Sequence, residues 1–136
     1  MTAAEWDWTQ HLVDHIELHA SDYETSVEFY TAVLAPLGVP HWNEDTETER
    51  ITCFTRLNVV DRQPATSGLH LCFIARSREQ VDAFHRAGVD GGFRSNGAPG
   101  YRDYAPGYYA AFLLDPDDKN IEALYRDVGN PGHGVA

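Results

Sequence analysis

The stretch "DHIELHASDYETSVEFYTAVLAPLG", residues 14–38, decides the fold of this chain. Apolar and polar residues alternate over residues 12–20, which is typical of a strand with one buried face. Ser21 followed by Glu24 has the spacing of a capping box, so a helix is predicted to begin there. Apolar residues then recur at helical spacing as far as Gly38, which is predicted to end the helix.

The same order of elements recurs 55 residues further along the chain. "LHLCFIA" (69–75) is strand-like, Ser77 with Gln80 repeats the capping box, and Gly88 is predicted to end a second helix. Identical residues meet at this offset in five pairs: His15 and His70, Ala20 and Ala75, Glu24 and Glu79, Phe29 and Phe84, Ala32 and Ala87. The shared order of strand, cap, helix and glycine indicates an internal repeat.

Each half continues with strand-like sequence after its helix. In the first half this is "VPHWN" (39–43) and "RITCFTRLNVV" (50–60). In the second half a Gly/Pro-rich loop (91–107) precedes "YYAAFLL" (108–114), a "DPDDKN" turn and "IEALYR" (121–126). The chain of 136 residues is therefore interpreted as one domain, with module one at about 11–62 and module two at about 68–127.

Composition restricts the classes of partner. The net charge of −11 argues against a nucleic-acid partner, and no apolar run has the length of a membrane span. The N-terminus lacks the pattern of a signal peptide, and Cys53 and Cys72 are expected to be reduced, buried residues, so a cytoplasmic location is expected. Trp6, Trp8 and Trp42 are expected in the core, at a dimer interface or around a ligand.

Alternation along the strands predicts which side chains share a face. Ile16, Leu18 and Ala20 are expected to face the helix, so His15, Glu17 and His19 face the other way. The second half repeats this arrangement, with His70, Cys72 and Ile74 on the face away from the helix. Glu122 and Leu124 are on one face of the last strand. If the repeat reflects a pseudo-two-fold axis, His15 and His70 converge near it and Glu122 can join them.

Two imidazoles and one carboxylate suit a divalent Fe, Mn, Ni, Co or Zn ion with open coordination positions. His15, His70 and Glu122 are therefore the candidate metal ligands. The alternative, which the pattern leaves open, is that the two histidines are hydrogen-bonded polar residues in a cleft. His19 shares the face of His15 and lies about 7 Å from it at the rise of a strand. It is a candidate ligand or general base, and the alternative is that it lines the wall of the cleft. His11, His41, His85 and His133 are expected to have no such role.

The Gly/Pro-rich loop supplies further candidates. Arg102 is a candidate for binding an anionic group, and Tyr104 or Tyr108 for donating a hydrogen bond to an oxyanion, because loops over clefts often contact substrate. Arg94 and Asn96 are candidate substrate-binding residues on the same segment. Ordinary loop packing is the alternative for each of them.

Three stretches together resemble the vicinal oxygen chelate superfamily, which includes glyoxalase I, bleomycin-resistance proteins, fosfomycin-resistance enzymes and extradiol dioxygenases. They are the opening stretch, "LHLCFIARSREQVDAFHRAG" and "PGYYAAFLLDPDDKNIEAL", and the resemblance covers about residues 12–126. It implies an α+β fold in which two βαβββ modules form a curled mixed sheet around a cleft, often in a homodimer. It also implies His15, His70 and Glu122 as metal ligands and a small-molecule substrate.

Departures from the family pattern narrow the function. Glyoxalase I uses a second acidic metal ligand, and the matching position in this chain is near Asn58, in a strand without Asp or Glu. Lactoylglutathione chemistry is therefore not expected. The loop that is histidine-rich in similar sequences has Asp103 and Ala105 here. In the final turn Asp118 replaces a glycine, and aspartate can adopt the left-handed backbone conformation that such a turn needs.

Three hypotheses for the function remain. The first is a metal-dependent lyase or dioxygenase-like enzyme that binds vicinal oxygens of its substrate. The second is a metal-free protein that sequesters a drug or ligand, as bleomycin-resistance proteins do, with the negative charge helping to hold a cation. The third is a structural or regulatory protein with a vestigial site.

Overall fold

Two open, four-stranded mixed sheets and two α-helices make up the computed structural model of this protein, which describes residue 5 and residues 12–127. The first half contains β1 (Ile16–Ala20), α1 (Tyr23–Leu34), the 3-10 helix η1 (Ala35–Leu37), β2 (Trp42–Asn43), β3 (Ile51–Phe54) and β4 (Leu57–Asp61). The second half contains β5 (His70–Ile74), α2 (Arg78–Asp90), β6 (Arg94–Tyr101), β7 (Tyr108–Leu114) and β8 (Asn120–Arg126).

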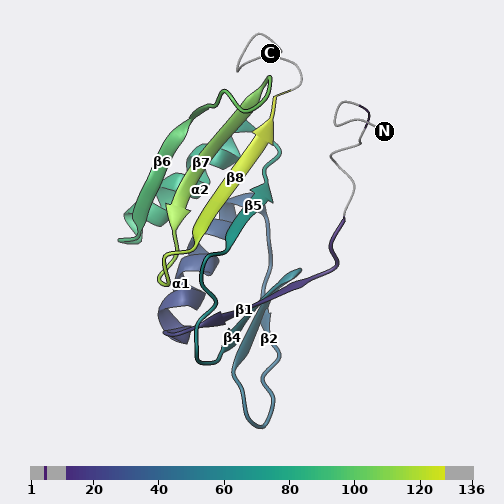
Figure 1. Cartoon of the computed structure of the whole chain (residues 1–136), viewed down its shortest axis with the longest axis vertical. Helices are drawn as coiled ribbons and strands as arrows, with labels where there is room; N and C mark the ends of the chain where they lie inside the picture. Colours follow the sequence, from purple (N-terminus) through teal and green to yellow (C-terminus); the bar gives the residue numbers. More distant parts are fainter. Residues whose placement is uncertain (1–4, 6–11, 128–136) are drawn as a thin grey trace.

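The two sheets repeat one topology. Their strand orders are β1-β4-β3-β2 and β5-β8-β7-β6, and in each the first and last strands of the half pair in parallel while the others are antiparallel. Figure 1 shows the second sheet in the upper part of the molecule and the first sheet in the lower part. The predicted α+β class and the two βαβββ modules are confirmed, and each sheet is open rather than closed on itself.

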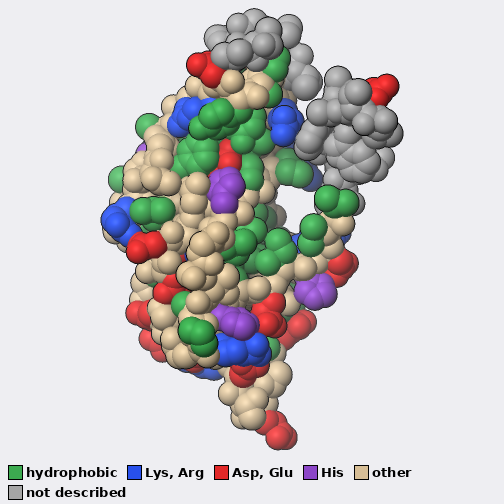
Figure 2. Space-filling model, viewed as in Figure 1, with side chains coloured by type: hydrophobic (Ala, Val, Ile, Leu, Met, Phe, Trp, Pro, Cys, Tyr) green, Lys and Arg blue, Asp and Glu red, His purple; other side chains and the backbone are tan. Residues whose placement is uncertain are grey.

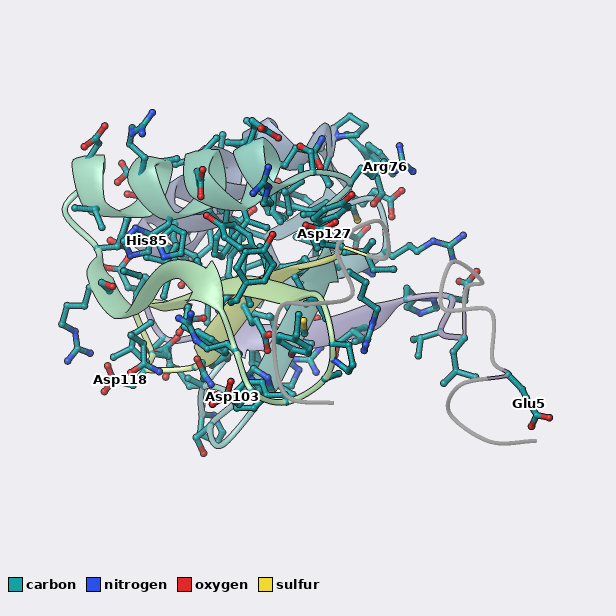
Figure 3. The ribbon with its side chains drawn as sticks, turned by 90° about the horizontal axis from the view of Figure 1, so that it is seen from above. Glu5, Arg76, His85, Asp103, Asp118 and Asp127 are labelled. Carbon is teal, nitrogen blue, oxygen red and sulfur yellow. The ribbon has the colours of Figure 1, made fainter. Side chains whose placement is uncertain are left out.

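The helices cover one face of the sheets, and this side forms a continuous core. Leu18 of β1, Phe84 of α2 and Ile121 of β8 are fully buried in one hydrophobic cluster that draws on both halves. Phe29 of α1 contacts the ring of Phe93, which follows α2, edge to face at 5.0 Å. In Figure 3 the helices lie over the sheet, and the labelled Asp103 and Asp118 lie on the side away from them. The opposite faces of both sheets are therefore left for other contacts.

The strand faces predicted by alternation are confirmed. Leu71 and Ala75 point to the core, whereas His70, Cys72 and Ile74 are exposed. Two details differ from the expectation. His15 lies just before β1 rather than inside it, and Cys72 is exposed, although Cys53 is buried as expected.

The first helix begins at a different cap from the predicted one. Its N-cap is Asp22, whose carboxylate accepts from the backbone N–H of Thr25 at 3.1 Å. Ser21 donates instead to the carboxylate of Asp117, which is 96 residues away. At the second helix Ser77 is the N-cap as predicted, and it accepts from Gln80 N–H.

One of the two glycines predicted to end a helix does so, and the other does not. Gly38 adopts a left-handed conformation after η1, as predicted for the residue that ends the helix. Gly88 lies inside α2, which continues to Asp90. A glycine is needed there because a Cβ would lie 2.5 Å from the side chain of Leu113. The missing side chain lets the helix approach β7 rather than ending the helix.

The middle of the segment predicted as a Gly/Pro-rich loop, Arg94–Tyr101, is strand β6. It pairs with β7 through a ladder interrupted by irregularities around Gly97 and Gly100. Because bulges tolerate glycine and proline, the residues that suggested a loop instead mark breaks in the register of an edge strand. Residues 91–93, between α2 and β6, and residues 102–107, between β6 and β7, remain outside the strands. The predicted left-handed Asp118 is confirmed by its φ of 64°.

Some expectations fall outside the described residues, namely those for Trp6, Trp8, His11 and His133. His41 is exposed and His85 lies on α2, as expected. Neither of the two α-helices that the structure describes is long and apolar enough to cross a membrane.

A buried polar cluster joins the two halves. The carboxylate of Asp115 accepts from the Tyr30 hydroxyl of α1 at 2.7 Å and from Lys119 Nζ at 3.3 Å. Lys119 also lies 3.6 Å from Asp117, the partner of Ser21. Lys119 and Asp115 are buried, so their charges compensate each other away from water. Burial, followed by the charge of Asp115, raises the pKa of Tyr30 well above its usual value, so it remains a hydrogen-bond donor.

Replacing Tyr30 with phenylalanine should lower the free energy of unfolding by about 1.5–3 kcal/mol, because the buried Asp115 carboxylate loses a donor. Urea denaturation followed by circular dichroism measures this change. Tyr125→Phe is the matched control, since Tyr125 is less buried and its hydroxyl makes no hydrogen bond with residues 12–127. Equal losses in the two variants would contradict a special contribution of the Asp115 contact.

Candidate metal half-sites and a neighbouring hollow

His70, Glu122 and Tyr108 form a cluster on the open face of the second sheet. His70 lies at the start of β5, Glu122 on the adjacent β8 and Tyr108 at the start of β7. His70 Nε2 lies 3.0 Å from Glu122 Oε1, and the Tyr108 hydroxyl donates to Glu122 Oε2 at 2.5 Å. Glu122 is buried while His70 is exposed. The pairing of β5 with β8 thus brings Glu122 into contact with His70.

Both ring nitrogens of His70 face acceptors. Nδ1 lies 2.9 Å from the backbone oxygen of Asn120, and Nε2 faces the Glu122 carboxylate. A neutral imidazole carries one N–H, so it can donate to only one of these two oxygens. When Nδ1–H donates to Asn120, Nε2 and Glu122 Oε1 both present lone pairs to each other, so a proton or another cation is needed between them. Such a backbone contact on the far nitrogen is typical of histidines that bind metals.

Tyr108 is held in its protonated form. Burial, then the hydrogen bond to Glu122, raise the pKa of the Tyr108 hydroxyl well above its usual value. Its hydroxyl donates to Glu122 and also lies next to the Cys72 thiol. Tyr108 can therefore orient the Glu122 carboxylate.

His15 lies in a separate hollow on the first sheet. The hollow has a volume of about 310 Å³ and is lined by Asp14, His15, Trp42, Glu44, Cys53, Thr55 and Asn58. His15 Nδ1 lies 2.7 Å from the carboxylate of Asp14, which leaves Nε2 for another partner. Glu44 accepts from the indole N–H of Trp42 at 3.0 Å. This hollow is acidic and aromatic, and it contains one imidazole.

One copy of the chain does not bring the three predicted ligands together. Among the residues that the structure describes, no group of three His, Cys, Asp or Glu side chains has the spacing of a metal site. Figure 2 shows histidines at separate places on the surface. His15 and His70 are nonetheless equivalent in the repeat. In each sheet, paired residues of the four strands form a row, and the histidine lies two residues before the first member of that row. The rows are Glu17, Asn58, Cys53 and Trp42 in the first sheet, and Cys72, Glu122, Phe112 and Gly97 in the second.

A second hollow adjoins the His70 cluster. It has a volume of about 260 Å³ and is lined by Asn96, Gly97, Arg102, Tyr104, Phe112 and Asn120. The ring of Phe112 lies nearly parallel to that of His70, with centroids 6.4 Å apart. Three of the loop and strand residues predicted to contact substrate, Asn96, Arg102 and Tyr104, therefore line one hollow.

Two predicted residues lie elsewhere. His19 Nε2 lies 2.9 Å from Glu17 and 3.0 Å from Arg62, on the first sheet. Arg94 forms an ion pair with Asp118 and does not line either hollow.

Sequence reasoning missed several residues of these hollows. Asp14 was detectable, because an acid next to a histidine can orient the ring. Cys53 lies on β3 and Glu44 directly follows β2, and the register of β2 with β3 brings them to the hollow of His15. Asn120 acts through its backbone oxygen, for which no sequence signal exists.

The comparisons with known proteins agree with this architecture. A sequence model of the Glyoxalase/Bleomycin resistance protein/Dioxygenase superfamily matches residues 12–123. The chain therefore belongs to this superfamily. No match was found among the curated proteins.

Solved structures support the same assignment. A glyoxalase/bleomycin resistance protein from Albidiferax ferrireducens T118 is 35% identical, with a TM-score of 0.65, over 83% of this chain and 97% of that chain. A glyoxylase/bleomycin resistance protein/dioxygenase domain from Frankia sp. EAN1pec has a TM-score of 0.66 at 16% identity, over 90% and 96% of the two chains. A lactoylglutathione lyase from Agrobacterium tumefaciens has a TM-score of 0.61 at 17% identity, over 86% and 95%. The last two show likeness of fold alone.

The first hollow makes a prediction about pH. Burial, and then the hydrogen bond and charge of Glu44, raise the pKa of the Cys53 thiol to about 11. Because the thiolate is the reactive form, alkylation of Cys53 should be slow at neutral pH and should increase as the pH rises towards that value. Glu44→Gln removes the charge that disfavours the thiolate, so it should lower the pKa and speed alkylation at a given alkaline pH.

Mass spectrometry of the Cys53 peptide after iodoacetamide treatment measures the rate. Glu47→Gln, in the exposed part of the same β2–β3 connection, is the matched control and should leave the rate unchanged. An unchanged rate in Glu44→Gln would show that Glu44 does not act on this thiol.

Proposed function

We propose that this protein is a divalent-metal-dependent enzyme that binds a small substrate through vicinal oxygens, with His70 and Glu122 as metal ligands. The supporting observation is the pair His70 Nε2 and Glu122 Oε1, 3.0 Å apart, with the other histidine nitrogen already at a backbone oxygen. Ligands about 2.1 Å from one cation and at right angles to each other are spaced by about 3 Å, so this donor pair fits a divalent ion. Iron, manganese, nickel, cobalt and zinc all accept this imidazole and carboxylate chemistry.

The protein's own groups prepare this pair. The Asn120 backbone oxygen orients the imidazole, and the Tyr108 hydroxyl orients the carboxylate. A divalent ion bound there would supply Lewis-acid stabilisation of negative charge on substrate oxygens. Tyr104 is exposed at the rim of the second hollow, where its hydroxyl can donate to a substrate oxygen. We assign Tyr108 to positioning, because its hydroxyl is bonded to Glu122, and assign the proposed donor role to Tyr104.

His15 supports a site made by two copies of the chain. It lies at the repeat-equivalent position to His70, and its Nε2 has no partner among the described residues, but it lies in the other hollow. The open sheet faces expose large hydrophobic residues, Trp42 at 44% and Ile74 at 64%, as expected where a second subunit packs. We therefore propose a homodimer in which His15 of one copy completes the ligand set of the other, with His19 in the wall.

The reaction proposed is of the lyase or dioxygenase-like kind rather than that of glyoxalase I. The position of the second acidic ligand is Asn58, which is the repeat equivalent of Glu122 and lines the first hollow. An amide there supplies a neutral oxygen in place of a carboxylate, so the ligand set has one acid fewer.

A second candidate function is supported by the lining of the first hollow. Asp14, Glu44 and Trp42 present two carboxylates and an aromatic ring, which suit an organic cation. In this alternative the protein sequesters a cationic drug without a metal. Retention of the full affinity for such a drug in metal-free protein would favour it.

Protein purified without chelators should contain a divalent metal, and the metal-free form should gain thermal stability when Ni²⁺, Mn²⁺, Fe²⁺, Co²⁺ or Zn²⁺ is added. His70→Ala and Glu122→Gln should each weaken metal binding by more than about 100-fold, because each removes a direct ligand. Calorimetric titration measures the affinities. His41→Ala is the matched control, because this exposed histidine lies outside both hollows and should leave metal binding unchanged. Absence of metal together with no thermal shift in the wild type would refute metal dependence.

Mixed dimers test the sharing of the site. His15→Ala and His70→Ala chains carrying different affinity tags are co-expressed, and the species with both tags is isolated. If each site takes His15 and His70 from different copies, one site of the mixed dimer keeps both histidines, and the metal content should be about half that of wild type. If both histidines come from one chain, the mixed dimer should contain almost no metal.

A further inference from the structure

The geometry points to a carboxylate-binding subsite at Arg102, in the second hollow, that selects a small monoanionic organic acid as the substrate. This inference names a substrate class for the site of the proposed function and depends on that function only for the adjacent metal. The subsite itself is argued from the contacts of Arg102, the charges around the hollow and the register of the sheet.

The backbone of strand β6 holds the guanidinium of Arg102 in place. Its Nη2 donates to the backbone oxygen of Ala98 at 2.6 Å, and its guanidinium carbon lies 5.4 Å from the centre of the Phe112 ring. A Cβ at Gly97 would lie 3.3 Å from Nη2, and a Cβ at Gly100 would lie 3.0 Å from Nη1. The two glycines therefore leave the space that the guanidinium occupies, and its position is restrained before any ligand arrives.

The charge of Arg102 is not neutralised by the described part of the protein. Arg50, Arg62 and Arg94 each form ion pairs with carboxylates, whereas no ion pair of Arg102 is found among the described residues. A guanidinium has five N–H donors, and the hydrogen bond of Arg102 to Ala98 uses one of them, on Nη2. The remaining donors are available to a ligand, and their fork geometry matches a carboxylate.

The second hollow lacks acidic residues in its lining. Its polar side chains, apart from Arg102, are those of Asn96, Tyr104 and Asn120, all uncharged at neutral pH. In the first hollow Asp14 and Glu44 oppose an anion. In a chain with a net charge of −11, an unpaired arginine in an acid-free hollow makes a local site for an anion. One arginine matches a single negative charge, which favours a carboxylate over a phosphate dianion.

The register of the second sheet places this hollow next to the proposed metal ligands. Glu122 of β8 pairs with Phe112 of β7, which pairs with Gly97 of β6, so the three lie in one row. Adjacent strands are about 4.8 Å apart, so one end of a small molecule can reach Glu122 while its other end meets Arg102 across Phe112. Asn120 links the two ends, since its backbone oxygen contacts His70 and its side chain accepts from Asn96.

Benzoate and benzamide test the subsite because they match in shape and differ in charge, and neither has vicinal oxygens. In NMR titrations of metal-free, ¹⁵N-labelled protein, benzoate should bind about tenfold more tightly than benzamide and shift the Arg102 side-chain signal. Arg102→Gln should remove the preference for benzoate. Arg86→Gln is the matched control, because this exposed arginine lies on α2, which covers the opposite face of the sheet, and it should keep the preference.

The outcomes separate the subsite from the metal. Equal affinity for benzoate and benzamide in the wild type, no binding of either, or a preference that survives in Arg102→Gln would each overturn the inference, whether or not a metal binds. If the protein binds Mn²⁺, the protons of benzoate should show paramagnetic relaxation in the wild type and lose it in Arg102→Gln. Failure to bind Mn²⁺ would count against the proposed function, while the metal-free titration would still decide the subsite.

Discussion

The carboxylate of Asp115 holds the second sheet in its position against the first half of the chain. It receives the Tyr30 hydroxyl from α1, the Lys119 ammonium and the backbone N–H groups of Asp117 and Lys119, all within 3.3 Å. Lys119 immediately precedes β8, which carries Glu122. The same cluster that neutralises a buried charge therefore also fixes the strand that presents the proposed metal ligand. Since a buried ion pair is tolerated only when its geometry is satisfied, this turn has little freedom to shift.

The two halves share a topology but have diverged on their open faces. Asn58 and Glu122 are equivalent in the repeat, as are Cys53 and Phe112. The first face presents His15 with acidic and aromatic neighbours. The second presents His70, a buried glutamate and Arg102, which makes no ion pair within the described part of the chain. A site assembled from two identical faces would carry like charges on both sides. In the proposed function, this divergence gives one face a carboxylate for the metal and a cation for the substrate, and the other face supplies a histidine and a wall.

The sequence predicted the parts of this structure that follow from local chemistry. Strand alternation correctly separated His70 and Glu122 from the core, and Ser77 was correctly identified as a helix cap. Ser21 was misassigned because two cap residues are adjacent, and the choice depends on Asp117, 96 residues away. Strand β6 was read as a loop because Gly97 and Gly100 suit irregular backbone, and only its pairing with β7 shows that they are breaks in a ladder. The separation of His15 from His70 depends on how the halves pack, which alternation does not encode.

The loop at residues 102–107 explains why the proposed metal and carboxylate groups belong to one unit. Arg102 N–H donates to the Tyr108 backbone oxygen at 2.8 Å, so the two ends of the loop are hydrogen-bonded to each other. Gly107 closes the loop with a φ of 71°, against the backbone of Asp127, where a Cβ would lie 2.3 Å from the carbonyl oxygen. One end thus carries the guanidinium over Phe112 and the other the hydroxyl that orients Glu122. Because a shift of either end moves the other, the loop closure fixes the distance between the proposed carboxylate subsite and the proposed metal ligands. The substitutions that give this loop Asp103 and Ala105 leave that closure intact, since it uses backbone groups.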